Sequence, residues 1–312
     1  MKMDLKRKRL QSKHAEYIVF DSMFQYVKAV DDQEGVHEDV EDLQDDEERL
    51  YVIRECLDDG SGENSWRFGD DLYKETYTDR FKNLNPREDI VSKIKDEFKQ
   101  SMNSDGLQHL FQEMVSKRRR REFRDDYGRF SIPRALSGNT DMFVNRKKKT
   151  SHGLKIGIKL GLNAGNNDSQ FVKLVTNLSV AVMMIEAAGI PVELHILFDG
   201  EQITSDWDRQ GISFIVKGSS ERMNINRIAL LGNVGMFRYH TFLAWCYFLS
   251  GEVRSGLGRD SNKGYKEDAK LLGLDIILGS EFKDNDVEAA FNLLTKQIFN
   301  KNDKVSQGTV DA

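Results

Sequence analysis

The chain has few cysteines, and their positions exclude most cysteine chemistry. Its 312 residues contain two, Cys56 and Cys246, which lie in different halves of the sequence and form no C-x-x-C pair. Disulfide frameworks and cysteine-bound zinc sites need more cysteines at closer spacing. We therefore expect a soluble protein of a reducing compartment, the cytoplasm, without disulfides or structural zinc.

A large net charge of one sign is also absent. Residues 1–150 carry 29 basic and 32 acidic side chains, residues 151–312 carry 17 and 19, and the formal net charge is −5. This balance argues against a uniformly cationic nucleic-acid-binding protein, although local basic blocks are present. No apolar segment of signal-peptide type follows the basic N-terminus. The longest apolar helix that we expect, residues 171–188, contains several polar residues, which predicts that it is too short and too polar to span a bilayer.

The common motifs of nucleotide binding and hydrolysis are missing. Gly161 and Gly165 do not complete a G-x-G-x-x-G fingerprint, no Gly-Lys-Ser/Thr follows them, and no G-x-S-x-G is present. His195 lies within an expected strand and His240 has no partner carboxylate near it in the sequence, so we expect both to be structural. The sequence predicts a protein that is not an enzyme.

The second half alternates apolar strands and helices. Residues 154–162 predict a strand, 163–169 a turn, 170–188 a helix and 192–198 a second strand. Further strands are expected at 212–216 and 274–278, with helices at about 223–249 and at 287–298. This order predicts an α/β domain over residues 151–300 with a doubly wound, mostly parallel sheet, followed by a polar tail at 301–312.

The first 150 residues predict a charged, mainly helical or irregular region. Short helices are expected at 17–30 and 50–57, and helical spacing runs from Ile90 to Arg121 with a break at 104–106. Residues 31–48 hold eleven carboxylates in eighteen positions, which indicates a solvated or disordered acidic run. The change of composition near Thr150 predicts a domain boundary there.

Polar residues follow each expected strand of the second half. In a parallel sheet the carboxyl ends of the strands meet at one edge, where α/β proteins bind ligands. We therefore expect a partner-binding face at this edge, over residues 163–169, 199–205, 217–221 and 279–282. Its candidate residues are Asn163, Gly165, Asn166, Asp168, Ser169, Asp199, Ser219 and Ser280.

Four stretches carry a resemblance to a known group of proteins. They are residues 130–138 with Met142, the turn 163–165, residues 222–229 leading to 236–238, and residues 275–280. Together they resemble an uncharacterised phage-encoded family with a von Willebrand factor A-like (vWA-like) Rossmann domain. The resemblance implies a doubly wound sheet and a viral origin.

Domains of this kind usually bind partners, often through a divalent metal ion held by an Asp-x-Ser-x-Ser turn at the end of the first strand. The matching positions here, residues 163–167, read Asn-Ala-Gly-Asn-Asn and lack the carboxylate and both hydroxyls. Mg²⁺ prefers charged oxygen ligands, so the resemblance implies a degenerate metal site. We expect no cofactor; the alternative is Mg²⁺ bound with the help of Asp168 and Asp199.

The resemblance leaves two functions open. The first is a phage-encoded, non-enzymatic protein that binds a phage or host protein complex, such as one containing an AAA+ ATPase, in the host cytoplasm. The alternative is a nucleic-acid-binding accessory factor in phage DNA replication or transcription, because two basic blocks, 117–121 and 146–149, flank a segment with interleaved aromatic residues. Its contact residues would be Arg118, Arg119, Arg120, Arg121, Lys147 and Lys148. Pairing of these blocks with the acidic run is a further possibility, and the oligomeric state stays open.

Overall fold

The computed structural model describes the parts of the chain that form helices and strands. These are residues 7–34, 85–118, 122–124, 129–130, 132, 136, 143–145, 153–160, 168–201, 209–232, 240–249, 265–279 and 287–296. Six of the described strands form the main sheet, and three short strands form a second sheet.

The main sheet has the strand order β1-β2-β8-β7-β6-β9. Its strands are β1 (Arg7–Gln11), β2 (Ala15–Phe20), β6 (Leu154–Lys159), β7 (Val192–Glu201), β8 (Arg209–Lys217) and β9 (Ile276–Leu278). β6 pairs in parallel with β7 and with β9, and β2 pairs in parallel with β8. The pairs β1–β2 and β7–β8 are antiparallel. The predicted α/β class with mostly parallel pairing is therefore confirmed, in a sheet that is mixed.

The antiparallel direction of β8 differs from the sequence-based expectation. Only residues 202–208 separate β7 from β8. A parallel connection needs a crossover of about a dozen residues or more, usually a helix, whereas a short connection joins antiparallel neighbours. The start of β8 therefore lies at the edge of the sheet where β7 ends.

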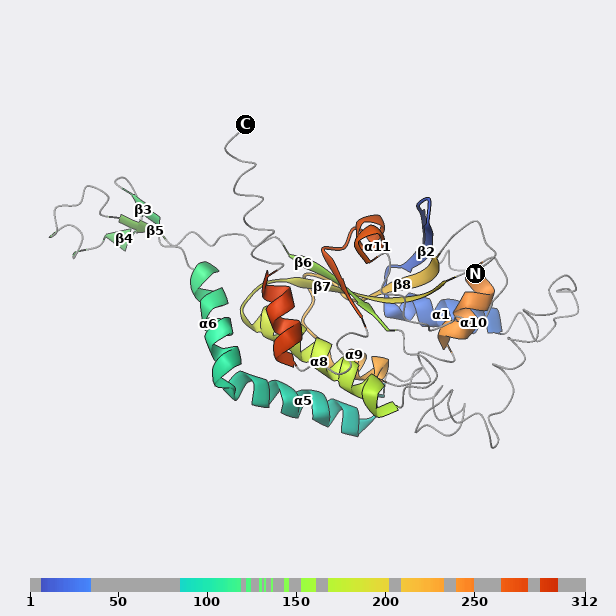
Figure 1. The fold of residues 1–312 in the computed structure, drawn as a ribbon, viewed down its shortest axis with the longest axis horizontal. Coiled ribbons are helices and arrows are strands. Elements are labelled where there is room, and N and C mark those ends of the chain that lie inside the picture. The colour runs from blue at the N-terminus through green and yellow to red at the C-terminus, as the bar shows by residue number, and fades with distance from the viewer. Residues whose placement is uncertain are drawn as a thin grey trace, which may run out of the picture.

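The helices cover the two faces of the main sheet unequally (Figure 1). Helices α1 (Met23–Glu34), α8 (Asp168–Ala187), α9 (Ile225–Leu231) and α10 (Thr241–Phe248) build the larger apolar core on one face, together with residues 287–296. On the other face α11 (Tyr265–Leu272) packs over a smaller cluster. Strand alternation produces this division: Ile196 and Phe198 of β7 lie in the larger core, and Leu197 lies in the smaller one.

Helix α8 is the central helix of the larger core. Residues 169–187 are long and apolar enough to cross a membrane by length and composition, contrary to the expectation from the sequence, but 72% of the apolar window is buried inside the protein. Helix α5 (Glu88–Asn103) packs along it. This burial explains the apolar composition of α8 as that of a core helix, which fits a soluble protein.

Two glycines end helices and return the chain to the sheet. Gly189 follows α8 with φ of 81°, and Gly273 follows α11 with φ of 67°. At each one the amide of the glycine and the amide after it bond to carbonyls of the last helical turn, as Gly189 N to Glu186 O and Ile190 N to Ile185 O. This is the Schellman arrangement, which favours glycine because other residues are strained at positive φ. Strands β7 and β9 begin a few residues later.

The N-terminal part of the chain belongs to the main sheet, which corrects two expectations. Residues 15–20 form strand β2, although a helix was expected from residue 17, and α1 follows from Met23 to Glu34. Since β1 and β2 extend the sheet that β6–β9 form, the predicted boundary near residue 150 does not separate two folding units. The acidic run begins inside α1, because residues 31–34 are its last turn; the rest of the run lies outside the described residues.

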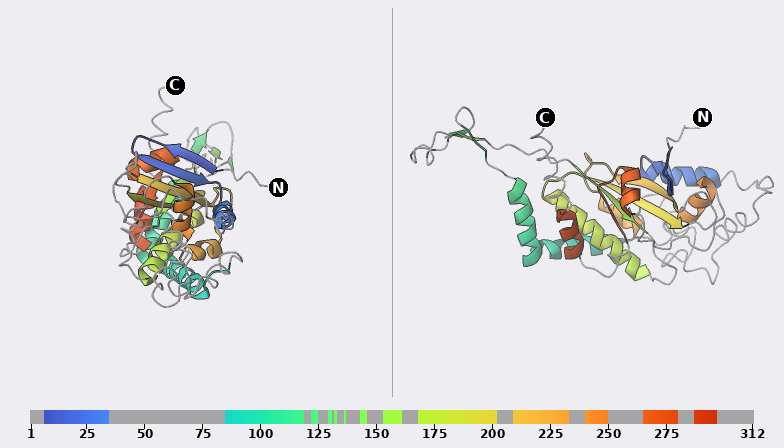
Figure 2. Two further views of the ribbon diagram at one scale, coloured as in Figure 1. Left: turned by 90° about the vertical axis from the view of Figure 1, so that its right-hand side faces the viewer. Right: turned by 45° about the horizontal axis from the view of Figure 1, so that its top comes forward.

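The expected helical stretch 90–121 is present as two helices. α5 ends at Asn103 and α6 (Asp105–Arg118) begins two residues later, at the predicted break. The second sheet follows, with β3 (Glu122–Arg124), β4 (Arg129–Phe130) and β5 (Phe143–Asn145) in the order β3-β5-β4. Figure 2 shows it beyond α6, apart from the main sheet.

Candidate functional site

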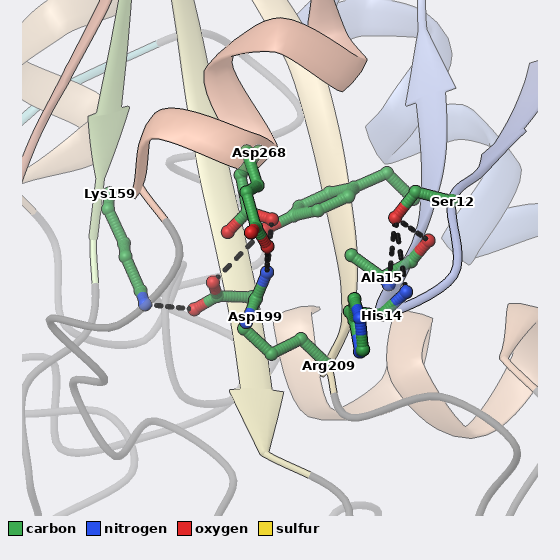
Figure 3. A network of polar contacts seen from close by, with 9 residues as sticks. Ser12, His14, Ala15, Lys159, Asp199, Arg209 and Asp268 are labelled. Atoms are coloured by element: carbon green, nitrogen blue, oxygen red, sulfur yellow. Dashed lines mark hydrogen bonds and ion pairs between the residues drawn. The ribbon is translucent and has the colours of Figure 1, made fainter.

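A buried ion pair joins the carboxyl ends of β6 and β7 (Figure 3). Lys159 is the last residue of β6, and Asp199 lies near the end of β7. The Lys159 Nζ atom is 2.7 Å from Asp199 Oδ1, and both side chains are almost completely buried, at 1% and 2% exposed. The Lys159 ammonium also lies 5.1 Å from the centre of the Tyr265 ring, so an aromatic face helps to stabilise the buried charge.

Tyr17 reaches this ion pair from the far side of β8. In the sheet Tyr17 of β2 pairs with Gly211 of β8, which pairs with Asp199 of β7. The Tyr17 hydroxyl donates to Asp199 Oδ2 at 3.1 Å. A Cβ atom on Gly211 would lie 2.5 Å from the Tyr17 ring and 2.8 Å from the carbonyl oxygen of Phe198. The glycine therefore leaves the space through which the tyrosine ring crosses the strand.

Arg209 and Asp268 form a second ion pair beside the first. Arg209 begins β8, and Asp268 lies in α11 on the same face of the sheet. The Arg209 guanidinium is 3.0 Å from Asp268 Oδ1 and 3.5 Å from the more exposed Glu267. We call Tyr17, Lys159, Asp199, Arg209 and Asp268 the buried polar network. Its two cations and two carboxylates are matched in number, which is what burial of charge requires.

Burial raises the pKa of two members of the network, Tyr17 and Asp268. Burial raises the pKa of the Tyr17 phenol well above its usual value of 10, and the negative charges of Asp199 and Asp268 raise it further. The phenol therefore stays protonated and acts as a hydrogen-bond donor rather than as a base. Burial also raises the pKa of Asp268, and this effect outweighs the lowering by Arg209.

The network does not fit a divalent metal ion. Mg²⁺ needs about six oxygen ligands and usually at least one free carboxylate. Here the oxygen atoms of Asp199 already contact the Lys159 ammonium and the Tyr17 hydroxyl. An ammonium ion 2.7 Å from the carboxylate occupies the position that a cation would take and repels a second positive charge. Within the ranges that the structure describes, no group of three or more His, Cys, Asp or Glu side chains has the geometry of a metal site.

An open apolar groove lies at the opposite end of β8. It has a volume of about 620 Å³ and runs between α1 and the last residues of β8. Its apolar lining comes from Met23, Phe24, Val27, Ile215 and Val216. Phe24 is 71% exposed and is the main accessible apolar side chain of the groove, because Met23 and Val216 are buried and Val27 is only 9% exposed. We call this feature the α1 groove.

Acidic residues outnumber basic residues around the α1 groove. The charged side chains that line it are Asp21, Lys28, Asp31, Asp32, Glu221 and Arg227. Asp21 is 3.9 Å from Lys8 and Glu221 is 3.5 Å from Arg227, in ion pairs whose side chains are all at least 40% exposed. Exposed pairs of this kind are screened by water and bind their partners weakly. The rim therefore presents a negative, solvent-accessible surface around an apolar floor.

One protein family matches the chain over most of its length. A family model described as a domain of unknown function, DUF7192, matches residues 25–304. The chain belongs to the DUF7192 family. No curated protein and no solved structure matches it. The DUF7192 match begins in α1 and ends beyond the last described helix. It includes Lys159, Asp199, Arg209 and Asp268 of the buried polar network and the groove lining from Val27 onward, whereas Tyr17 and Phe24 precede it.

The DUF7192 chain does not bring all the predicted partner-binding residues to one edge. Asp199 lies at the carboxyl end of β7, and Asp168 and Ser169 begin α8. Ser219 follows β8, which runs antiparallel to β7, so it lies at the opposite edge, beside the α1 groove. The expectation that Ser219 joins Asp199 is wrong for this reason.

Most of the other predicted contact residues lie outside the described residues. For the sheet edge these are Asn163, Gly165, Asn166 and Ser280. Among the basic residues, Arg118 is the last residue of α6; Arg119, Arg120, Arg121, Lys147 and Lys148 are not described. Their predicted roles stay predictions.

Sequence reasoning missed four of the five residues of the network and placed the end of the first strand too late. The strand was expected to continue to Leu162, whereas β6 ends at Lys159. A signal was present, because Lys155 and Lys159 alternate with the apolar residues of β6 and therefore share one face. Lys159 stands last on that face, at the edge where ligands of α/β proteins bind. Tyr17 and Asp268 carry no such signal, since they come from distant segments.

Proposed function

We propose that this DUF7192 protein is a non-enzymatic protein-binding protein that acts in the cytoplasm and needs no metal ion. The observation that carries the proposal is the α1 groove, which has a volume of about 620 Å³ and an apolar lining in which Phe24 is 71% exposed. Contiguous exposed apolar surface on a folded chain is typical of binding sites for other proteins. The exposed phenylalanine would be the anchor of such a site, because aromatic side chains supply much of the binding energy at interfaces.

The buried polar network supports the non-enzymatic part of this proposal. Catalytic acids and bases must exchange protons with a substrate and so need access to it. Lys159, Asp199 and Asp268 are at most 6% exposed and contact each other or Tyr17 and Arg209. Such an arrangement is typical of a structural network that fixes β2, β6, β7, β8 and α11 relative to each other.

The vWA-like resemblance remains part of the proposal. Strand β6 continues through α8 to β7 on one side, and β9 lies on its other side. This change of direction at β6 supports a doubly wound vWA-like domain. Lys159, the last residue of β6, brings a positive charge to the end of the strand where the resemblance implies a metal ion, which supports a metal-independent domain. A viral origin, and action beside a phage or host complex such as one with an AAA+ ATPase, belong to the same proposal.

Site-specific crosslinking tests protein binding at the groove. A photoreactive phenylalanine analogue is placed at position 24 in one variant and at Leu293 in another, and both are expressed in the native cells. Leu293 is also an exposed apolar residue, at 39%, and it lies on the helix at 287–296 away from the groove lining. Position 24 should give discrete adducts to another protein that position 293 does not give. Identical adduct patterns at the two positions would contradict the proposal.

Thermal unfolding tests the metal-independent part. Because Lys159 neutralises Asp199, millimolar Mg²⁺ should leave the melting temperature of the wild type unchanged at matched ionic strength. A ligand that binds only the folded state would raise it. A rise that disappears in Asp199→Asn would show a metal site at this position and overturn this part of the proposal.

A further inference from the structure

The charge around the α1 groove indicates which kind of partner it accepts, and this inference rests on the proposed protein-binding function. We propose that the groove binds a basic, apolar peptide segment of a partner protein: one or two large apolar side chains with lysine or arginine on either side. The apolar residues would pack on Phe24, Val27 and Ile215. The basic residues would lie against the acidic rim.

The acidic residues stand on more than one side of the apolar floor. Asp21 precedes α1, Asp31 and Asp32 lie in its last turns, and Glu221 follows β8. The two lysine and arginine side chains of the lining, Lys28 and Arg227, are fewer than these four carboxylates. A basic segment lying in the groove would therefore be attracted by a carboxylate at each end. The same carboxylates would repel an acidic segment.

The existing ion pairs leave the acidic side chains of the rim available to a binding partner. Lys8 pairs with Asp21, and Arg227 pairs with Glu221. All of these side chains are exposed, so the basic residues of a partner can displace Lys8 and Arg227. Asp31 is less accessible, since its side chain is 25% exposed and its Oδ1 atom lies 3.6 Å from Nε2 of the buried His240. Asp32 is exposed. We therefore expect Asp32 and Glu221 to select the charge of the partner, while Phe24 supplies most of the affinity.

Phe24 faces outward from a helix that other side chains hold in place. The neighbours of Phe24 on α1 point into the core: Met23 and Tyr26 are nearly fully buried, and Tyr26 stacks on Phe214 at 4.5 Å between ring centres. The helix is held by these contacts whether or not Phe24 is covered. Binding then requires little rearrangement of α1, which reduces the loss of conformational entropy on association.

Selection from a displayed library of random short peptides tests the partner's chemistry on the full-length chain. The enriched peptides should combine aromatic or long aliphatic residues with at least two lysines or arginines. Affinity of the best peptide, measured by fluorescence anisotropy, should decrease at least about tenfold in Phe24→Ala, a change typical of the loss of an anchor residue. It should decrease with rising salt in the wild type, because the attraction between charges is screened.

Charge reversal separates this inference from the proposed function. In the double variant Asp32→Lys/Glu221→Lys, the basic peptide should bind weakly and the library should now enrich acidic peptides. Asp96→Lys/Glu97→Lys on α5, outside the groove lining, is the matched control and should leave binding unchanged. Circular dichroism and thermal melting confirm that each variant is folded.

The possible outcomes are distinct. Enriched peptides that are acidic or uncharged, yet depend on Phe24, overturn the basic partner and leave protein binding at the groove intact. Enrichment that is independent of Phe24 overturns both. Self-association of the wild type that Phe24→Ala abolishes, measured by light scattering, assigns the groove to a second copy of this chain and overturns the inference.

Discussion

At the scale of single residues, Lys159 shows how a charge can be placed in the interior. Its ammonium and the Asp199 carboxylate are both buried, so each depends on the other for stability. Removing one partner of a buried pair leaves an uncompensated charge, whereas replacing both by apolar residues is often tolerated. This asymmetry separates the buried pair from the surface pairs of the same sheet face.

Lys159→Ala should therefore lower the free energy of unfolding by about 3–5 kcal/mol. The double change Lys159→Met/Asp199→Leu should cost clearly less than Lys159→Ala alone. Lys155→Ala is the control, because its pair with Glu193 is half exposed and such a pair contributes only about 0–1 kcal/mol. Urea denaturation of the three variants measures these differences. Equal losses in Lys159→Ala and Lys155→Ala would show that the network does not depend on the buried pair.

His195 gives the folded chain a dependence on pH. Burial lowers its pKa below the ordinary 6.5, although Glu193, 3.0 Å from the ring, partly offsets this. The folded state thus binds this proton less readily than the unfolded state. The stability it contributes is fully present above pH 6.5 and is lost as the pH falls through the lower pKa of the folded chain.

His195→Gln should remove this dependence. Between about pH 7 and about pH 5, the free energy of unfolding should decrease more in the wild type than in the variant. Denaturant unfolding at several pH values measures the two curves. Glu193→Gln is a useful second variant, because its removal should enlarge the decrease. Parallel curves for wild type and His195→Gln would mean that His195 is not the group responsible.

At the scale of helices and strands, local sequence patterns predicted the elements whose formation depends on neighbouring residues in the chain. The β6–α8–β7 unit follows from an apolar strand, a long apolar helix and Gly189. The predicted direction of β8 was wrong because the alternation of apolar and polar residues in a strand does not specify whether it runs parallel or antiparallel to its neighbour. The length of the connection does, and residues 199–211 hold no helical run that could serve as a crossover. The N-terminal strand β2 was missed because its pairing with β8 joins segments almost two hundred positions apart.

The turn from α11 to β9 provides a test at this scale. Gly273 has φ of 67° and nothing within 4 Å of an added Cβ atom, so only backbone strain opposes a side chain there. Gly273→Ala should lower the free energy of unfolding by about 1–2 kcal/mol. Gly273→Asn should lose less, since asparagine tolerates positive φ. Gly218→Ala is the control, because its Cβ atom would meet only a flexible glutamate at 3.7 Å. An asparagine variant as unstable as the alanine variant would contradict a strain-based explanation.

At the scale of the whole molecule, the sequence did not predict which residues gather at each end of the main sheet. The predicted binding edge assumed that all strands end together, which placed Ser219 beside Asp199. With β8 reversed, one end of the sheet collects the buried polar network and the other opens into the α1 groove. The groove has no local motif, because its floor comes from α1 and β8 and its exposed phenylalanine stands among buried neighbours.

The nucleic-acid alternative stays a prediction, and its test also belongs to this scale because it depends on where positive charge lies on the molecule. If the basic block after α6 contacts phosphates, Arg119, Arg120 and Arg121 should release counterions on binding, and each contact adds about 0.7 to the slope of log affinity against log salt for single strands. The triple change to glutamine should therefore reduce that slope by up to about 2 and weaken retention on single-stranded DNA. The matched control removes three exposed lysines of α5, Lys93, Lys95 and Lys99. Since both variants lose the same net charge, an equal loss of binding would show a general effect of charge, and unchanged binding in both would exclude the alternative at this block.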